Sequence, residues 1–384
     1  MCPDQSGNGM KILHITLHYA DGWGYQDNLL PLYQQRSGAM VTVVADNGHF
    51  PHSMTPQERQ AILDQGDDYR DGQVRVRKIR TALTSRDSAL ACSGLGRVLR
   101  EEEPDLIFHH GLHLPTLWVA CRYARRHPRC VLLADSHADP FNASRHRLWR
   151  ALYGRFLLRM LVRTAGRQVD LFYGVTPLRC DYLVSEYGIP ADKVRLLPLA
   201  GDDRGLSIDA ASARRSLGIP EDAFLVVSGG RMGPEKGTDR LVQAWERLRP
   251  SHPGLELLLF GSMEKSFPLP EGVRVLGWCD REKTLSILSA ADVAVWPLFH
   301  TTLVEDAIVC GTPVIVKDSG NVSHYKEDGL GLFLETGSVD EIAGALERMI
   351  REAPSFCARV EACRKRYTYA ALVAQLEKDC REFE

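Results

Sequence analysis

The sequence lacks several features that would assign it to a specialised class of protein. Its ten cysteines include no CxxC pair and no Cys/His cluster at zinc-ligand spacing, so neither a redox motif nor a zinc site is indicated. No stretch approaches the roughly 20 apolar residues of a membrane span. Repeats and low-complexity tracts are missing too. With a formal net charge of -2, nothing indicates a nucleic-acid partner. Scattered cysteines suit the reduced thiols of a cytoplasmic protein.

The beginning of the chain lacks the basic start and apolar run of a signal peptide. Residues 1–9, MCPDQSGNG, are therefore expected to form a disordered leader, and the fold is expected to begin at Met10. At 384 residues the chain exceeds the usual size of one core, so two domains with a cleft between them are predicted. We place the first domain at residues 10–199 and the second at residues 200–354. A final helix at residues 355–384 is expected to pack back on the first domain.

Short apolar runs alternate with segments of helical period. Continuous apolar runs are typical of strands covered by helices on both faces, and so of doubly wound parallel sheets of the α/β class. The expected strands of the first sheet are residues 11–17, 40–45, 105–110, 130–136, 170–175 and 194–199, and those of the second are residues 224–230, 255–261, 273–278, 293–298 and 312–317. Two Rossmann-like domains are predicted, with ligands beyond the carboxyl ends of the strands.

The most informative loop follows the strand expected at residues 224–230. In GGRMGPEKGTDR, two glycines end the strand, and Arg231 and Lys236 precede a helix expected from Thr238. An arginine fork and a lysine point charge beside a glycine turn suit a diphosphate. A surface loop with solvated charges is the alternative.

A second phosphate-binding element is expected after the strand at residues 293–298. Gly311 in CGTPVIV is typical of the end of a helix, and that helix is expected to begin near Thr301. Free amides and the helix dipole at its N-terminus would bind an anion. A simple capping role for Thr301 or Thr302 is compatible with this prediction.

Two further glycines, Gly22 and Gly24, lie between the first strand and the first helix. Glycine there lets the backbone approach a ligand closely. A GxG alone is equally consistent with a tight turn.

Together these motifs resemble the retaining glycosyltransferases of family 4, the glycosyl transferases group 1. This family has the GT-B fold of two facing Rossmann-like domains, with a C-terminal helix that crosses back to the first. GGRMGPEKGTDRLVQAWERL resembles its donor-diphosphate motif, VRLLPLAGD its interdomain segment and VRVLGW its base-contacting strand. The segment beginning VEDAIVCGTPVIVK resembles its nucleotide-sugar region. The resemblance extends from Met10 over nearly the whole chain.

The resemblance implies roles for individual residues. Arg231 and Lys236 would hold the donor diphosphate and stabilise it as the leaving group. His137 in LLADSHADP would face the transferred sugar, and the backbone at Trp278 and Cys279 would contact the base. The remaining donor-binding positions are Gly22, Gly24, His300, Thr301, Thr302, Leu303 and Asp306. No metal and no cofactor is expected beyond the donor, a UDP- or GDP-type sugar nucleotide.

The sequence departs from the family at one of two glutamates that are separated by seven residues. Counting back from Gly311 places the second at Asp306 and the first at Leu298. Asp306 could accept hydrogen bonds from the ribose hydroxyls, whereas Leu298 cannot contact sugar hydroxyls. Glu305 would face about 100° away on a helix. An altered sugar contact or slower turnover is expected, with His300 or Thr301 as the nearby replacement.

Seven arginines and no acidic residue occur from Arg145 to Arg167. Arg155, Arg159, Arg163 and Arg167 fall on one helical stripe, beside Trp149, Tyr153, Phe156 and Met160 on a neighbouring face. Such a helix could rest on an anionic membrane surface and bring a lipid-linked acceptor to the cleft. A helix that packs by its apolar face and exposes a solvated basic face is the alternative.

The sequence thus predicts a cytoplasmic, metal-independent transferase that moves a hexose-type sugar to a hydroxyl of a glycan or lipid-linked acceptor, with retention of configuration. Leu298 favours a second hypothesis, a GT-B scaffold that binds nucleotide or glycan as a partner subunit without transferring sugar. A nucleotide-sugar epimerase of similar two-domain shape is a third.

Overall fold

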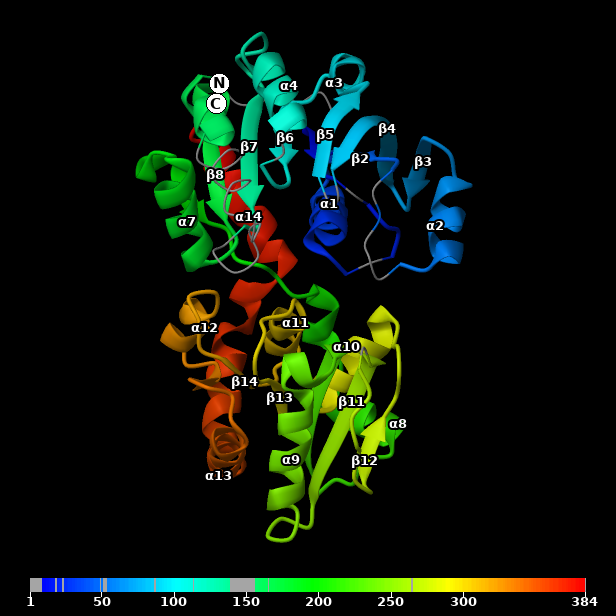
Figure 1. The fold of residues 1–384 in the computed structure, drawn as a ribbon, viewed down its shortest axis with the longest axis vertical. Helices are drawn as coiled ribbons and strands as arrows, with labels where there is room; N and C mark the ends of the chain where they lie inside the picture. The colour runs from blue at the N-terminus through cyan, green and yellow to red at the C-terminus, as the bar shows by residue number, and fades with distance from the viewer. Residues whose placement is uncertain are drawn as a thin grey trace. The chain divides into compact units, whose positions relative to one another are not determined.

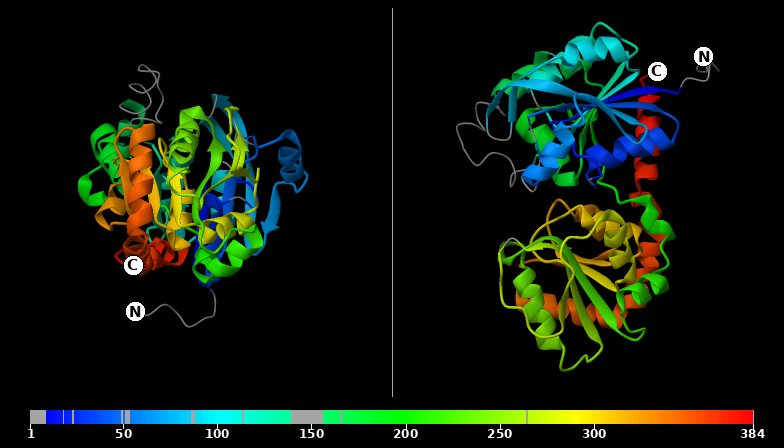
Figure 2. Two further views of the ribbon diagram at one scale, coloured as in Figure 1. Left: turned by 90° about the horizontal axis from the view of Figure 1, so that it is seen from below. Right: turned by 90° about the vertical axis from the view of Figure 1, so that its right-hand side faces the viewer.

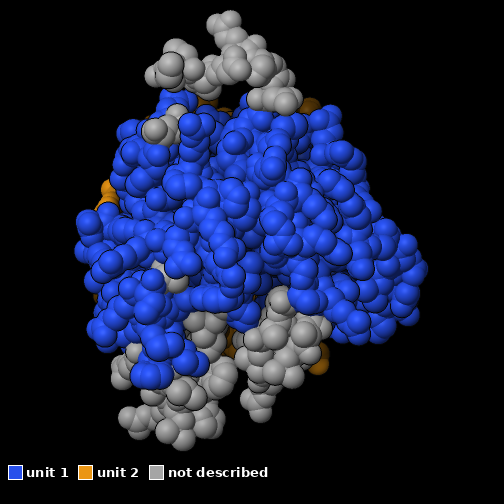
Figure 3. All heavy atoms as spheres, turned by 90° about the horizontal axis from the view of Figure 1, so that it is seen from above, with its two compact units in different colours: residues 1–198, 373–384 blue, residues 199–372 orange. Residues whose placement is uncertain are grey.

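The computed structural model describes residues 9–17, 19–22, 24–48, 50, 54–85, 88–112, 114–138, 156–164, 166–263 and 265–383. Of the leader expected at residues 1–9, residues 1–8 lie outside this set. Two compact units make up the chain (Figure 3). Unit 1 comprises Met1–Pro198 and Val373–Glu384, and unit 2 comprises Leu199–Leu372. The last residues of the chain therefore belong to the unit formed by its first half.

Unit 1 contains a nine-stranded sheet in the order β3-β4-β2-β1-β6-β7-β8-β9, with β5 paired to β4 (Figure 1). Its strands are β1 (Lys11–Ile15), β2 (Met40–Asp46), β3 (Asp68–Asp71), β4 (Val74–Ser85), β5 (Ser88–Ser93), β6 (Leu106–His109), β7 (Val131–Ser136), β8 (Leu171–Gly174) and β9 (Val194–Leu196). Its helices include α1 (Gln26–Arg36), α2 (Pro56–Leu63), α3 (Leu95–Glu102), α4 (Leu114–Ala124), α6 (Arg159–Thr164) and α7 (Pro177–Tyr187), with 3-10 turns η2 (Gly166–Gln168) and η3 (Ala191–Lys193).

The expectation of purely parallel sheets is wrong at one edge of unit 1. Strand β4 pairs antiparallel with both β3 and β5. The beginning of β4 alternates, with Val74 and Val76 buried and Arg75 between them partly exposed. A strand with one solvated face has a period of two and no continuous apolar run. The search for apolar runs therefore missed β3, β4 and β5.

Unit 2 contains a six-stranded sheet in the order β12-β11-β10-β13-β14-β15, in which every pairing is parallel. Its strands are β10 (Phe224–Met232), β11 (Leu255–Met263), β12 (Val273–Val275), β13 (Val293–Trp296), β14 (Val314–Lys317) and β15 (Gly331–Leu334). Its helices are α8 (Ala210–Leu217), α9 (Thr238–Leu248), α10 (Arg281–Ala290), α11 (Leu303–Val309), α12 (Ser323–Glu327) and α13 (Val339–Cys363), with 3-10 turns η4 (Asp203–Ser207), η5 (Pro234–Lys236) and η6 (Arg364–Tyr367). The doubly wound parallel sheet predicted for this half is confirmed.

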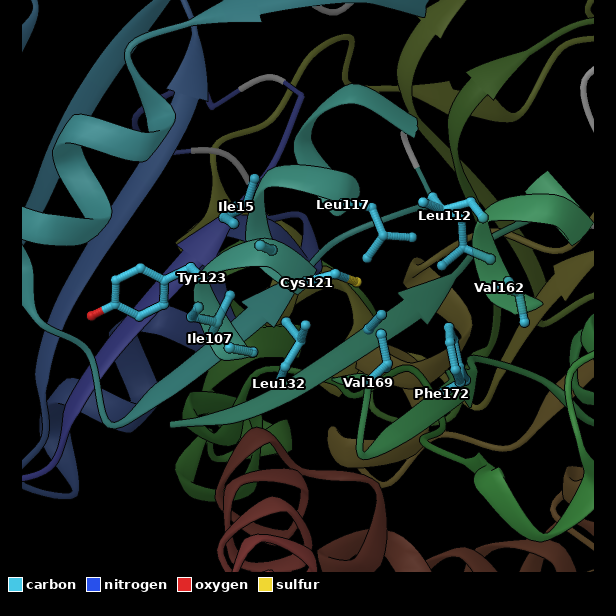
Figure 4. Close-up of a cluster of buried hydrophobic side chains, with 14 of the residues drawn as sticks. Ile15, Ile107, Leu112, Leu117, Cys121, Tyr123, Leu132, Val162, Val169 and Phe172 are labelled. Carbon is cyan, nitrogen blue, oxygen red and sulfur yellow. The ribbon is translucent and has the colours of Figure 1, made fainter. Parts of the chain in front are cut away.

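Helices cover both faces of the sheet in unit 2 (Figure 2). Alternate residues of β10 are buried on opposite faces of this sheet. Leu225 and Val227 pack in one apolar cluster, and Val226 packs in another. The first cluster includes side chains of α8, α10 and α11, and the second includes those of α9 and α13. In unit 1, Ile107, Leu132 and Phe172 of neighbouring strands form one buried cluster with residues of α4 (Figure 4).

The single helix predicted at residues 355–384 is wrong. Helix α13 continues to Cys363, η6 follows, and α14 (Tyr369–Cys380) begins after an extended residue, Thr368. Thr368 pairs with Gly201 in an isolated bridge, which interrupts the helical hydrogen bonds. Near the end of α14, Asp379 accepts hydrogen bonds from Tyr173 and Arg195 at 2.7 Å each. These contacts attach the end of the chain to unit 1.

Candidate functional site

The strand order of unit 2 reverses between its neighbouring strands β10 and β13. The chain runs from β10 to β11 and β12 on one side, and then returns to β13 on the other. In an open parallel sheet, ligands bind beyond the carboxyl ends of the strands at this reversal. The loop after β10 contains Lys236, and the loop after β13 contains His300. The two loops expected to bind the donor therefore begin at the same point of the sheet.

Contacts in unit 2 bring these two loops together. The Nζ of Lys236 lies 4.0 Å from the centroid of the Phe299 ring. Gly230 has a φ of +96°, which favours glycine. It lies close to the β13 loop, since a Cβ built on Gly230 would be 3.5 Å from Leu303 Cδ1 and 4.0 Å from Thr301 Oγ1. Arg231 is exposed and is part of β10, which continues two residues beyond its predicted end. Of the predicted phosphate-binding pair, Lys236 thus lies beside the β13 loop, and Arg231 directly follows Gly230 in β10.

The helix expected to begin near Thr301 begins two residues later. Helix α11 starts at Leu303, and its N-cap Thr302 makes no side-chain capping hydrogen bond. Gly311 follows the helix with a φ of +88°, as predicted. The phosphate-binding role of the amides near Thr302 and Leu303 stays a prediction.

The positions expected to contact the base lie after β12, at the same edge of the sheet. Strand β12 ends at Val275, three residues before its predicted end, because the chain turns at Gly277. Trp278 is 73% exposed, and the Cys279 thiol donates to the Gly277 carbonyl at 3.6 Å. A large aromatic surface is therefore open to solvent at this edge.

Leu298 packs against two glycines of unit 2. A Cβ at Gly237 would lie 2.9 Å from Leu298 Cγ, and one at Gly337 would lie 2.7 Å from Leu298 Cδ2. Leucine therefore fills the space above two backbone segments that approach closely. The side chain stabilises the loops by apolar contact.

Asp306 is engaged in a buried ion-pair network. Both oxygens of its carboxylate accept hydrogen bonds from Arg281 at 2.5 Å, and Oδ1 also accepts from the Asp202 amide at 3.0 Å. Arg281 Nε donates to the Asp202 carboxylate at 3.1 Å. Asp306 is only 2% exposed. These hydrogen bonds hold the carboxylate inside unit 2, and its expected role toward the ribose stays a prediction.

Opposite charges in this network counteract the effect of burial, although burial still raises the pKa of Asp306. Burial favours the uncharged form of each group, but Arg204 and Arg281 hold the pKa of Asp202 well below its usual value. Burial likewise opposes the charge of Arg281, yet Asp306 and Asp202 raise its pKa. The network connects η4 at the start of unit 2 with α10 and α11.

Glu305 points away from this network, as expected for the adjacent residue of a helix. Its Oε1 accepts a hydrogen bond from His300 Nε2 at 2.9 Å and another from the Tyr325 hydroxyl. The side chain is fully buried. Burial alone would raise the pKa of Glu305, but His300 and Tyr325 bring it below the usual value. Glu305 and Asp306 thus belong to two separate hydrogen-bonded clusters.

The candidate residues of unit 1 also follow carboxyl ends of parallel strands. His137 comes after β7, and Gly22 and Gly24 come after β1. His137 Nε2 lies 3.6 Å from Asp135 Oδ2, and its side chain is 41% exposed. Gly22 has a φ of +73°. Their roles toward a donor stay predictions.

A buried polar chain beneath His137 was not predicted from the sequence. Gln34 Oε1 lies 2.6 Å from His14 Nε2, His14 Nδ1 lies 2.9 Å from His110 Nε2, and His110 Nδ1 lies 3.1 Å from Asp135 Oδ2. Gln34 Oε1 and the Asp135 carboxylate are acceptors, so each of the two outer hydrogen bonds needs a protonated ring nitrogen. The hydrogen bond between the two rings needs one further proton. Two assignments satisfy all three, because the proton between the rings can be carried by His110 or by His14; we adopt neutral His14 and doubly protonated His110.

The pKa shifts agree with this proton assignment. Burial, and then the nearby His110, lower the pKa of His14 to about 3. Burial opposes a charge on His110, but Asp135 and Asp27 raise its pKa. His110 and His137 in turn outweigh the burial of Asp135 and hold its pKa well below the usual value. In the sequence, this polar chain is indicated by three polar residues that lie in, or directly after, strands whose other residues are mostly apolar.

Only part of the arginine-rich segment can be described. Residues 145–155, with Arg145 and Arg155, lie outside the described residues. Arg159 Nη2 donates to the Ser185 carbonyl at 3.0 Å, so Arg159 does not share a solvated stripe with Arg163. Arg163 and Arg167 are exposed.

Two classes of site receive no support from the described part of the chain. No group of three or more His, Cys, Asp or Glu side chains there could hold a metal ion. None of its helices combines the length and apolar character needed to cross a bilayer.

Two Rossmann-like sheets, one with its reversal point beside an Arg/Lys loop, define a GT-B glycosyltransferase fold. Comparison with solved structures supports this class. HepE from Anabaena, solved in complex with UDP, superposes with a TM-score of 0.69 at 18% sequence identity, over 97% of this chain and all of that chain. Residues 34–203 match the family model "Glycosyltransferase Family 4", and residues 209–370 match "Glycosyl transferases group 1". Together the two matches fit a group 1 glycosyltransferase.

Curated relatives match shorter parts of the sequence. A D-inositol 3-phosphate glycosyltransferase of Paenarthrobacter aurescens is 30% identical over 45% of this chain, which covers 47% of that protein. A GDP-mannose-dependent monoacylated alpha-(1-6)-phosphatidylinositol monomannoside mannosyltransferase of Corynebacterium glutamicum is 22% identical over 67% of this chain and 70% of its own length. The chain thus spans about half the length of the first of these relatives.

Proposed function

We propose that the protein transfers a hexose-type sugar from a nucleoside diphosphate sugar to a hydroxyl of a glycan or lipid-linked acceptor, with retention of configuration and without a metal ion. The observation that carries this proposal is the meeting of the Lys236 loop and the β13 loop at the strand reversal of unit 2. Similarity to the group 1 glycosyltransferases favours transfer over epimerisation. The donor would be of the UDP or GDP type, since one relative is named as GDP-mannose-dependent and one structural neighbour was solved with UDP.

The chemistry assigned to this loop is electrostatic. In the transfer, the bond between the anomeric carbon and the diphosphate breaks, and negative charge develops on the departing phosphate. Arg231 and Lys236 would stabilise that charge, the arginine through a fork and the lysine as a point charge. The acceptor oxygen would bond to the anomeric carbon on the face that the diphosphate leaves, and its proton would pass to the departing phosphate, so the configuration is retained.

Removal of the lysine charge tests the proposal. In the Lys236→Ala variant, nucleotide release from the donor should fall by about 100-fold or more, because a preorganised charge at the leaving group is lost. The measurement is nucleoside diphosphate release across a panel of nucleotide sugars, with the anomeric configuration of any product determined by NMR.

Lys365→Ala removes an exposed cation of η6 in the same unit and is the matched control, with activity expected to stay at the wild-type level. A wild-type protein that binds nucleotide but turns over none of the donors and acceptors would overturn the transferase proposal. That outcome would support the scaffold hypothesis, which is favoured by the replacement of the first family glutamate by Leu298.

A peripheral contact with the inner face of the membrane is part of the same proposal. Phe156 is 60% exposed and Met160 is 50% exposed, and they lie four residues apart, near the exposed Arg163 and Arg167. Apolar side chains beside cations suit an anionic lipid surface, which would supply a lipid-linked acceptor.

Co-sedimentation with vesicles containing phosphatidylglycerol should therefore weaken when Arg163 and Arg167 are changed to Gln. Each cation near an anionic surface contributes about 1 kcal/mol, so binding should fall by roughly 10-fold or more. The matched control changes Arg97 and Arg100 of α3 to Gln, which removes the same charge elsewhere in unit 1. Equal loss of binding in both double variants would show a general charge effect and contradict a specific contact.

A further inference from the structure

Glu305 occupies an unusual environment in unit 2. Its carboxylate is fully buried, and one oxygen, Oε1, accepts both described hydrogen bonds, from His300 and Tyr325. The other oxygen, Oε2, is buried and has no hydrogen-bond partner among the described residues. Burying a carboxylate with incomplete hydrogen bonding costs free energy. Neighbouring Asp306, by contrast, uses both of its oxygens. A purely structural carboxylate would be expected to resemble Asp306.

The hydrogen bond to Glu305 determines the chemical state of the His300 ring. Because a carboxylate only accepts, His300 Nε2 must carry a proton and donate it to Oε1. The other ring nitrogen, Nδ1, is then an acceptor in the neutral ring and a donor in the charged ring. No described residue forms a hydrogen bond with Nδ1. Tyr325, which also donates to Oε1, fixes the carboxylate and so the orientation of the ring.

The position of His300 places this ring at the candidate donor site. The preceding residue, Phe299, contacts Lys236, and the following residue, Thr301, lies over Gly230. The His300 side chain is 11% exposed, so the ring is largely buried and yet reaches the surface of the loop. Leu298, where the family has a glutamate, is directed at Gly237 and Gly337. The polar group nearest to the missing carboxylate along this loop is therefore the imidazole.

We propose that His300, held by Glu305 and Tyr325, binds a hydroxyl of the sugar nucleotide through Nδ1. This inference rests on the proposed function, because it assumes that the donor binds at this edge of unit 2. The hydroxyl belongs either to the ribose or to the transferred sugar. His300 is the contact residue, and Glu305 and Tyr325 are positioning residues.

Two substitutions of His300 separate a ligand contact from a structural role. The amide of asparagine can occupy the place of Nδ1, whereas the longer glutamine amide reaches the place of Nε2 and can keep the contact with Glu305. Titration calorimetry would measure the dissociation constants of UDP-glucose and GDP-mannose for the full chain. His300→Phe should weaken binding of the preferred donor by about 3- to 10-fold, as expected for one lost hydrogen bond. His300→Asn should recover part of this loss, and His300→Gln should not.

The source of the hydroxyl follows from parallel titrations with UDP and GDP. If His300 binds the ribose, affinity for the free nucleotide falls together with affinity for the donor. If it binds the transferred sugar, only affinity for the donor falls. His252→Asn is the matched control, because His252 lies in a turn before β11, at the opposite edge of the same sheet. It should bind like the wild type.

A double-mutant cycle tests the positioning role of Glu305. Glu305→Gln should weaken donor binding in the wild-type background and have no further effect in the His300→Phe background. Better binding by His300→Gln than by His300→Asn, or unchanged binding in His300→Phe, would overturn the inference. Because these results are binding constants, they can fail while Lys236-dependent turnover persists, so this inference and the proposed function are tested separately.

Discussion

Replacement of Arg281 by methionine is expected to lower the free energy of unfolding by about 3–5 kcal/mol. The substitution keeps the length of the apolar stem but removes the cation that holds Asp306 and Asp202, which are 2% and 0% exposed. Asp306 would then lose its counter-charge, and Asp202 would keep only Arg204. Urea denaturation followed by tryptophan fluorescence would measure the change, since Trp245 and Trp296 are buried in unit 2.

The interpretation requires that the loss arise from unpaired charge. Arg247→Met is the matched control, because Arg247 pairs with Asp340 at the exposed surface and such pairs contribute little. Adding Asp306→Asn to Arg281→Met should recover part of the lost stability, since one buried charge disappears. A double variant as unstable as the single variant or less stable would contradict a dominant charge effect.

Acidification is expected to destabilise unit 1 through His14. The pKa of His14 in the folded protein, about 3, lies below its ordinary value of 6.5, so the unfolded chain binds more protons between these pH values. Stability present above about pH 6.5 is therefore lost as the pH falls, by up to about 1.4 kcal/mol per pH unit. The groups that face His14 are Gln34, His110, Asp27 and Asp135.

The measurement is the free energy of unfolding from urea titrations between pH 7 and pH 4. His14→Gln has no titrating ring, so its stability should fall less steeply than that of the wild type. His127→Gln is the matched control, because His127 lies in the turn after α4, where it stacks on Tyr123. Identical slopes for the wild type and His14→Gln would show that other groups govern acid unfolding.

The sequence predicted those strands whose side chains are buried on both faces, because such strands are short continuous runs of apolar residues. Val293–Trp296 and Val314–Lys317 are continuous apolar runs because helices cover both faces, and both were found. Strand β4 was missed because only every second side chain at its start is buried. The tertiary arrangement decides which face of an edge strand stays solvated. The pattern of apolar residues in such a strand depends on that face.

The candidate site shows a similar limit. Glu305 and Asp306 are adjacent carboxylates in one helix, and counting residues favoured Asp306 for the ribose. Its hydrogen-bond partner, Arg281, lies 25 residues earlier, and nothing in the helix itself indicates the pairing. His14 and His110 are separated by 96 residues and meet only because β1 and β6 are neighbours. Long-range partners of this kind cannot be read from local spacing.

The attachment of the chain's end to unit 1 bears on how the protein folds during synthesis. Unit 2 is continuous in sequence, so all of its strands are available before translation ends. Unit 1 emerges first, yet Asp379, the partner of Tyr173 and Arg195, is made only after the whole of unit 2. At about 5–20 residues per second, that interval is roughly 10–35 s. During this interval unit 1 lacks the helical segment that contains Asp379. The incomplete unit is then accessible to chaperones and proteases.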